Sequence, residues 1–233
     1  MAQLKRFVVF GAGPALGLAA ARRFGREGHA VTLVGRTAAT VDALVDTLRA
    51  EGVPAERLLA DLHDPAAARA AAERVGLPDA VLYSPGGTER LPVAATALDA
   101  ATLTTWLPIT LLSPLEIART LVPGMVVRGS GAFLVAQGIA VREVLPELAS
   151  VAVGQSGLLT YLRGLARSVE PHGVRVASLQ IGRLIKGSAA EALVEQGRYD
   201  GVQQGPMPRV DPVELADRLW ELAQPAAPVE LVA

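Results

Sequence analysis

The first 24 residues constrain the fold most, because an apolar run leads directly into a glycine-rich turn and then into a helix pattern. Residues 7–10 (FVVF) suit a strand that is buried on both faces, and residues 18–24 (LAAARRF) favour a helix. Between them, the turn GAGPALG lets a ligand approach the backbone closely. A helix that starts here offers N–H groups without intrahelical partners, together with the positive end of its dipole. The stretch therefore predicts a pyrophosphate-binding strand–turn–helix unit.

The spacing of the three glycines is weaker evidence for dinucleotide binding than the position of the turn between a strand and a helix. The glycines are Gly11, Gly13 and Gly17, whereas the usual dinucleotide fingerprint places its third glycine at 16, where this chain has Leu16. Such turns also serve as ordinary tight connections. This one follows a strand pattern and opens a first βαβ unit of about thirty residues, which favours dinucleotide binding.

The rest of the chain alternates strand and helix patterns. Further strands are predicted at residues 30–34, 57–60, 79–83, 131–136, 174–181 and 229–232. A helix is predicted from about residue 98, with interruptions at Pro108 and at Pro123–Gly124, and a long helix at 154–169. This alternation predicts an α/β protein: a single-domain doubly wound parallel sheet (Rossmann fold) over residues 1–233, with helices on both faces.

Composition excludes several classes of function. A net charge of −1 argues against a nucleic-acid partner, which needs a clustered basic surface. The absence of cysteine excludes disulfides and thiol nucleophiles, makes a metal site unexpected, and is compatible with a reducing cytoplasm. The N-terminus lacks a signal-peptide pattern, and the uncharged run at 100–115 is too short and broken to span a bilayer. We therefore expect a cytoplasmic protein with no membrane partner.

Residues after the second and third predicted strands indicate which dinucleotide is bound. Arg36 and Thr37 occupy the place where an acidic residue would favour a free ribose 2′-hydroxyl. A guanidinium suits a 2′-phosphate, so NADP(H) is expected, although Arg36 could instead be an ordinary exposed residue at a strand end. Asp61, followed by Leu62, is a candidate acceptor for the adenine amino group. Its alternative role is to cap the next helix, for which Asp64 is better placed.

With these motifs, the chain resembles the short-chain dehydrogenase/reductase (SDR) family over nearly its full length. The resemblance is carried by the turn at 11–17, by Asp61-Leu62, by Tyr83-Ser84-Pro85-Gly86 in place of the family's Asn-Asn-Ala-Gly, and by residues 170–176 and 181–182. Ala15 departs from the family, which prefers glycine there. The resemblance, together with the motifs above, implies cofactor contacts at Gly11, Gly13, Ala15, Leu16, Gly17, Arg36, Thr37, Asp61, Leu62, Ser84, Pro85, Gly86, Ile181 and Gly182.

The catalytic positions that the resemblance implies are all substituted. The family uses a tyrosine to transfer a proton, a lysine four residues later to lower the tyrosine pKa, a serine to polarise the carbonyl, and an asparagine in a proton relay. The matching positions here hold Val151, Gln155, Gly138 and Thr110. Valine has no proton to give, and glutamine carries no charge. Ordinary ketone reduction should therefore lack the roughly 10²- to 10⁴-fold benefit of a positioned acid.

Other candidate residues have weaker patterns. The tyrosines are expected to be mainly structural and the histidines to lack partners, namely Tyr83, Tyr161, Tyr199, His29, His63 and His172. Residues 185–210, rich in glycine, are predicted to form a substrate lid. Small residues at 155–159 resemble the family's interface helix, which implies a homodimer or homotetramer.

Three functions stay open from the sequence. The first is an NADP(H)-dependent oxidoreductase that transfers hydride on a small, apolar or pre-activated substrate, such as an iminium or a conjugated enone. The second is a catalytically inactive NADP(H)-binding sensor or partner protein. The third is a non-redox lyase, isomerase or cyclase on the same fold. The first is preferred only by analogy with the family.

Overall fold

The computed structural model describes residues 4–86, 90–198 and 208–233. Within them the chain forms one seven-stranded sheet with the order β3-β2-β1-β4-β5-β6-β9, in which all neighbours are parallel. The strands are β1 (Lys5–Phe10), β2 (His29–Gly35), β3 (Ala55–Leu59), β4 (Ala80–Tyr83), β5 (Gly131–Gly138), β6 (Val174–Ile181) and β9 (Glu230–Val232). The order reverses between β1 and β4, and ligands of such sheets bind at the carboxyl ends beside this switch point.

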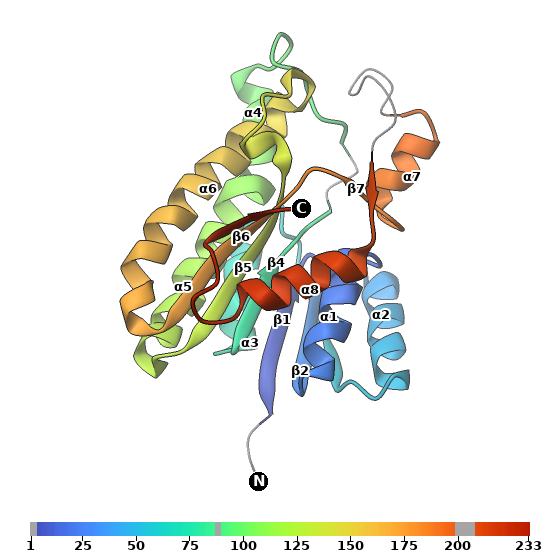
Figure 1. The fold of residues 1–233 in the computed structure, drawn as a ribbon. Coiled ribbons are helices and arrows are strands. Elements are labelled where there is room, and N and C mark those ends of the chain that lie inside the picture. Colours follow the sequence, from blue (N-terminus) through green and yellow to red (C-terminus); the bar gives the residue numbers. More distant parts are fainter. Residues whose placement is uncertain (1–3, 87–89, 199–207) are drawn as a thin grey trace.

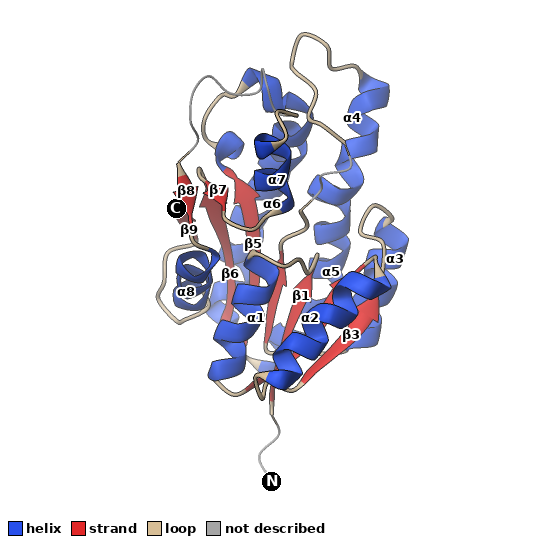
Figure 2. Cartoon of the chain, turned by 90° about the vertical axis from the view of Figure 1, so that its right-hand side faces the viewer, coloured by secondary structure: helices blue, strands red, loops and turns tan. Residues whose placement is uncertain are grey.

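Helices cover both faces of the sheet (Figures 1 and 2), which confirms the predicted fold class. One face packs against α3 (Pro65–Val75), α5 (Ser113–Arg128) and α6 (Ala149–Val169), and the other against α1 (Leu16–Arg26), α2 (Ala38–Ala50) and α8 (Pro212–Leu222). Each face has its own apolar core, because β1 alternates Val8 and Phe10 toward one side with Phe7 and Val9 toward the other. Burial on both faces explains why these strands are continuous apolar runs.

The interruption predicted at Pro108 appears as a change of helix type, whereas the break predicted at Pro123–Gly124 is wrong. The chain stays helical through α4 (Ala100–Leu107), a π-helical turn at Pro108–Leu112, and α5. Because proline has no N–H, the helix widens at Pro108 instead of ending, and the Ser113 N–H donates to the Pro108 carbonyl. Pro123 lies inside α5, whose neighbouring side chains are buried in the core. Packing therefore overrides the local signal.

The combined helix Ala100–Arg128 is the one helix in the described chain that is long and apolar enough to cross a membrane, with a mean hydropathy of 1.2. Half of its most apolar window is buried inside the fold, which is usual for a core helix. Its length and apolar composition therefore fit a helix that packs in the core of the fold.

The predicted lid region holds ordered elements where it is described. It contains β7 (Leu184–Ile185), which pairs with β8 (Arg209–Val210), and the short helix α7 (Ala189–Glu195). Glu191 ties them together by accepting hydrogen bonds from the Gly187 N–H at 2.7 Å and from Arg209 Nε at 2.7 Å. Residues 199–207, including Tyr199, lie outside the described part, so the lid stays a prediction.

Candidate functional site

The glycine turn after β1 is shaped by close backbone packing. Gly11 has a φ of +87°, and a Cβ built on it would lie 2.4 Å from the Cα of Pro85, so only glycine fits there. A Cβ on Gly17 would lie 3.2 Å from the Cα of Ala12. By contrast, a Cβ on Gly13 would meet nothing within 4 Å. The turn therefore packs tightly against the chain at two glycines and leaves open space at the third.

Helix α1 begins at Leu16, directly after this turn. Its N-cap, Ala15, provides no side-chain hydrogen bond, and the first turn holds no acidic residue. Within the described chain, the N–H groups of Leu16 and Gly17 donate to no other group, whereas the Leu18 N–H donates to the Gly13 carbonyl at 3.0 Å. These amides and the helix dipole form a site for an anion at the switch point of the sheet.

The β4 segment lies beside this turn, because β1 and β4 are paired. The Ser84 N–H donates to the Phe10 carbonyl at 2.9 Å, and Pro85 contacts Gly11. The Ser84 hydroxyl is buried and has no hydrogen-bond partner among the residues that the structure describes. A buried polar atom without a partner is costly unless a ligand or water satisfies it. This hydroxyl, the open space at Gly13 and the amides of α1 all fit a bound dinucleotide.

The adenosine end of the predicted site is a cavity of about 150 Å³. It is lined by Arg36, Asp61, His63, Arg90, Thr105, Trp106 and Ile109. Asp61 Oδ1 accepts hydrogen bonds from the His63 N–H at 3.0 Å and interacts with His63 Nδ1 at 3.1 Å. The pKa of Asp61 is lowered, first by the backbone N–H of His63 and to a smaller degree by the His63 ring and the positive charge of Arg36. Asp61 is therefore held as an anion close to Arg36.

At this end of the site one sequence expectation is wrong and another is confirmed. His63 was expected to have no partner and is paired with Asp61. Asp64, not Asp61, caps α3 by accepting a hydrogen bond from the Ala66 N–H at 2.9 Å, which leaves Asp61 for the cavity. Leu62 is buried in the core, with its carbonyl bound by the Ser113 hydroxyl at 2.8 Å, and the described residues that line the cavity do not include it.

The other predicted cofactor residues also lie at the carboxyl edge of the sheet. Arg36 and Thr37 follow β2 and are exposed, and Gly86 is an exposed residue after β4. Ile181 ends β6, and the next residue, Gly182, donates its N–H to the Ala233 carbonyl at 2.8 Å. Because all the strands are parallel, these segments share one edge with the glycine turn.

Of the four positions that the sequence aligns with the family's catalytic residues, three take part in two contacting pairs of residues. The first pair joins the π-helical turn to α6: Thr110 Oγ1 donates to the Trp106 carbonyl at 2.7 Å, and a Cβ on Gly154 would come within 2.0 Å of that oxygen. In the second pair, Gln155 Oε1 accepts a hydrogen bond from the Gly138 N–H at 3.3 Å. Val151 is half-buried one turn before Gln155 on α6. No polar side chain at these positions is left to exchange a proton.

Two buried polar side chains, those of Gln137 and Ser178, stabilise the segment that carries the second pair, Gly138 and Gln155. Gln137 Nε2 donates to the Gln155 carbonyl at 3.1 Å, and Gln137 Oε1 accepts from the Ser178 hydroxyl at 3.0 Å. Gln137 and Ser178 are almost fully buried. These contacts fix the end of β5 against α6, and the sequence pattern gave no signal of them because the partners are far apart in the chain.

Tyr83 has the structural role that the sequence favoured. Its hydroxyl donates to the Ile109 carbonyl at 2.6 Å in the π-helical turn, and complete burial raises its pKa well above the ordinary value. Tyr161 is half-buried against the core, and burial also raises its pKa. His29 is buried, with Nδ1 3.1 Å from the Phe24 carbonyl. None of these described side chains has the surroundings of a proton donor.

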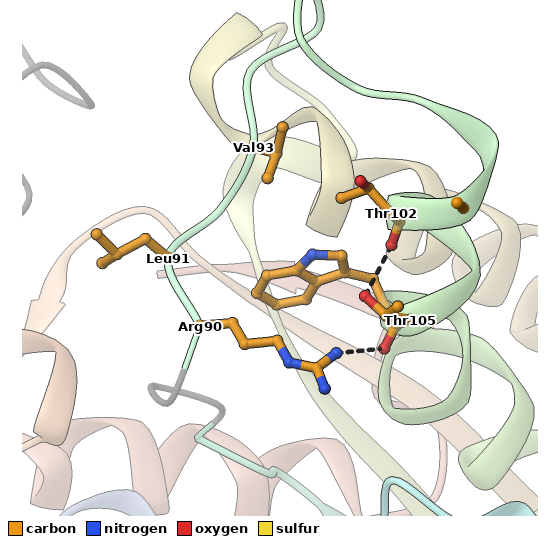
Figure 3. Close-up of a pocket in the computed structure, with 7 residues that line it drawn as sticks. Arg90, Leu91, Val93, Thr102 and Thr105 are labelled. Carbon is orange, nitrogen blue, oxygen red and sulfur yellow. Dashed lines mark hydrogen bonds between the residues drawn. The ribbon is translucent and has the colours of Figure 1, made fainter.

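A second cavity of about 390 Å³ adjoins the adenosine cavity, sharing Arg90, Thr105 and Trp106 (Figure 3). Its further walls are the strap at Leu91 and Val93 and the α4 residues Ala101 and Thr102. Sequence reasoning did not single out Arg90 or Trp106, because neither belongs to a motif. Their shared position on the two cavities follows only from the tertiary fold.

Comparisons with known proteins agree on the family. The family profile described as short chain dehydrogenase matches residues 5–195. Galactitol 2-dehydrogenase (L-tagatose-forming) from Cereibacter sphaeroides is 31% identical over 229 residues, which cover 94% of this chain and 87% of that protein. Glycine betaine reductase from Emericella nidulans is 28% identical over 94% of this chain, and fatty acyl-CoA reductase from Mycobacterium tuberculosis is 31% identical over 54% of it. The matched regions span 17% and 45% of these two relatives, less than half of each.

Solved structures share the fold over nearly the whole chain. A variant of actinorhodin polyketide ketoreductase with NADPH has a TM-score of 0.85 at 21% identity, with 100% of this chain and 97% of that chain covered. A metagenomic short-chain oxidoreductase in complex with NADP has a TM-score of 0.78 at 21% identity, with 99% and 97% covered. Together with the family profile, these findings show that the chain belongs to the short-chain dehydrogenase/reductase family of oxidoreductases.

Proposed function

We propose that the protein binds NADP(H) and transfers hydride to or from a small, apolar or pre-activated substrate, such as an iminium or a conjugated enone. One observation carries the proposal: the groups that suit a phosphorylated dinucleotide are in place, while Val151 and Gln155 offer neither a proton nor a positive charge. Family membership supports the redox chemistry, as does the relative named galactitol 2-dehydrogenase.

Four groups of the chain would hold the coenzyme. The amides of Leu16 and Gly17 suit the pyrophosphate, and the guanidinium of Arg36 suits a 2′-phosphate. The ionised Asp61 carboxylate suits the adenine amino group, since its Oδ2 has no hydrogen bond within the described chain. The Ser84 hydroxyl would gain the partner that it lacks. Structural neighbours that carry NADP or NADPH support this assignment.

The nicotinamide ring, when bound, supplies or accepts the hydride, and the surrounding residues limit which substrates can react. The Gln155 amide oxygen is engaged by the Gly138 N–H, and the Thr110 hydroxyl by the Trp106 carbonyl. An amide N–H is too weak an acid to protonate a developing alkoxide, and the Thr110 hydroxyl proton is held by the Trp106 carbonyl, so a ketone loses roughly 10²- to 10⁴-fold in rate. A substrate whose acceptor carbon is already cationic or conjugated avoids most of this penalty.

Coenzyme oxidation with a panel of acceptors tests the proposal. Purified protein and NADPH are mixed with iminium salts, conjugated enones and simple ketones, and the coenzyme absorbance is followed. We expect the activated acceptors to react at least about 10²-fold faster than ketones of the same size. Unchanged absorbance with every acceptor would contradict hydride transfer while leaving coenzyme binding to be measured by calorimetry.

Replacing Arg36 tests the choice of coenzyme. We expect Arg36→Ala to lower NADPH affinity by about ten- to a hundredfold, because a charge-assisted hydrogen bond to phosphate contributes about 1.5–3 kcal/mol. NADH affinity should stay within about twofold. Isothermal titration of both coenzymes with both proteins measures the difference, and equal NADPH affinity in the two proteins would overturn the assignment.

A second candidate is an NADP(H)-binding protein without catalysis, acting as a sensor or as the inactive partner of an active relative. The internal hydrogen bonds of Thr110 and Gln155 favour it, since both polar side chains are committed to the fold. Tight NADPH binding with no turnover on the acceptor panel would select this candidate. A non-redox lyase, isomerase or cyclase is favoured by no residue in the described ranges.

We also propose self-association through the α5–α6 surface. Leu112 and Val153 are 40% and 48% exposed there, and a Cβ on Gly157 would lie 3.6 Å from Leu111, so a small residue faces an apolar neighbour. Gel filtration with light scattering should give a homodimer or homotetramer, and a monomer at micromolar concentration would contradict this.

The cytoplasmic location stays a prediction, which cell fractionation would test.

A further inference from the structure

Arg90 lies where two cavities meet, although no motif contains it. It lines the 150 Å³ adenosine cavity together with Arg36, Asp61 and His63, and it also lines the adjoining 390 Å³ cavity. Figure 3 shows its side chain with Nη1 directed at the Thr105 carbonyl. That hydrogen bond is 3.4 Å long, at the outer limit of the usual range, so it holds the guanidinium only weakly.

Two guanidinium groups and one carboxylate are among the described residues that line the adenosine cavity. Arg36 and Arg90 come from separate parts of the fold, and Asp61 is the one carboxylate among these described lining residues. Asp61 interacts with His63 and lies near the charge of Arg36. Among the described residues, no Asp or Glu lies within ion-pair distance of Arg90. The Arg90 guanidinium is therefore placed to meet an anionic ligand in this cavity.

The backbone of the strap that carries Arg90 is fixed by hydrogen bonds to Pro146 and Ser150. The Val93 N–H donates to the Ser150 hydroxyl at 2.9 Å, and the Ser150 N–H donates to the Val93 carbonyl at 3.1 Å. The Ala95 N–H donates to the Pro146 carbonyl at 2.8 Å. Trp106 is the buried residue of α4, 7% exposed, and it lines both cavities together with Arg90. Arg90 is thus presented to the cavity by an anchored strap that runs beside α4.

We propose that Arg90 is a specificity-determining residue for the 2′-phosphate of NADP(H), provided that the proposed NADP(H) function is correct. It acts from the α4 wall of the cavity, while Arg36 acts from the end of β2. A phosphomonoester has three oxygens and about two negative charges near neutral pH, so it accepts from two guanidinium groups at once. NADH lacks that group and gains nothing specific from Arg90.

Titration of the wild type, Arg90→Ala and Arg90→Lys with four probes tests this role. The probes are NADPH and NADH, with 2′,5′-ADP and 5′-AMP as the matched fragments. We expect Arg90→Ala to bind NADPH and 2′,5′-ADP about tenfold more weakly and the other two within about twofold. Arg90→Lys should lose less, because it keeps the charge but not the forked donors. Arg119→Ala, which removes a guanidinium paired with Glu116 on the outside of α5, is the control.

The outcomes separate this inference from the function on which it rests. Equal losses of affinity for all four probes would mean that Arg90 only lines the cavity, which would overturn its role in specificity. Unchanged binding of NADPH and 2′,5′-ADP in Arg90→Ala would overturn it too, with the NADP(H) function intact. Failure of the wild type to bind either coenzyme would overturn both.

Discussion

Glu230 gives the sharpest stability prediction, because one carboxylate joins three parts of the fold. It begins the edge strand β9, and Oε1 accepts from Arg163 Nε at 2.5 Å. Oε2 accepts from Gln180 Nε2 at 3.0 Å and from Arg142 Nη2 at 2.5 Å. The Glu230 side chain is only 15% exposed. These partners lower the pKa of Glu230 from 4.5 to about 2, and the hydrogen bond from Arg163 is the largest cause.

This lowering sets the size and the pH range of the effect. Taken in full it corresponds to a ceiling of about 3 kcal/mol of stability. Arg142 and Arg163 are 42% and 50% exposed, so solvent screens the pairs and we expect about 1–2 kcal/mol for Glu230→Gln at pH 7. Since the folded pKa is the lower one, the contribution is complete above about pH 4.5 and is lost as the pH falls toward 2.

Urea unfolding at pH 7 and pH 3.5 measures both the size and the sign. Glu230→Gln should be less stable than the wild type by about 1–2 kcal/mol at pH 7, and the difference should shrink at pH 3.5. Glu221→Gln is the control, because Glu221 is 60% exposed and has one longer contact to Arg218. Its stability should change by no more than about 0.5 kcal/mol. A Glu230→Gln protein that matches the wild type at pH 7 would refute the reasoning.

Two further predictions concern the π-helical turn. Tyr83→Phe should cost about 1–3 kcal/mol in urea unfolding, because it leaves the buried Ile109 carbonyl without its donor; an unchanged midpoint would mean that the hydrogen bond adds nothing. Gly154→Ala should cost a similar amount, since its methyl group would overlap Thr110 Oγ1. Gly164→Ala, on the same helix with nothing within 4 Å, should instead stabilise by about 0.5–1 kcal/mol, and equal effects at both glycines would contradict the steric argument.

The strand framework could be predicted because most of its strands contain an apolar run with clear limits. Val174–Ile181 has the predicted bounds, since a glycine stands on either side of it. The long helix before it starts at Ala149, five residues earlier than the predicted start at 154. Its first turn is fixed by the contact between Ser150 and Val93, and no local pattern reports a contact between residues so far apart.

The site could be predicted only where it follows a strand end. The glycine turn, Arg36 and Asp61 were found because parallel strands bring their carboxyl ends to one edge. Arg90 and Trp106 escaped because they come from a strap and a helix whose positions depend on packing. The break predicted at Pro123–Gly124 is wrong for a related reason: local propensity favoured a break, and the burial of α5 outweighed it.

The hydrogen bond between Gly138 and Gln155 limits which side chains can replace Gln155 without a cost at the neighbouring strand. The Gly138 N–H donates to Gln155 Oε1 at 3.3 Å. A lysine at 155 has only donors, so it would leave the Gly138 N–H without this acceptor. A substitution at this position of α6 therefore also changes the contacts at the end of β5.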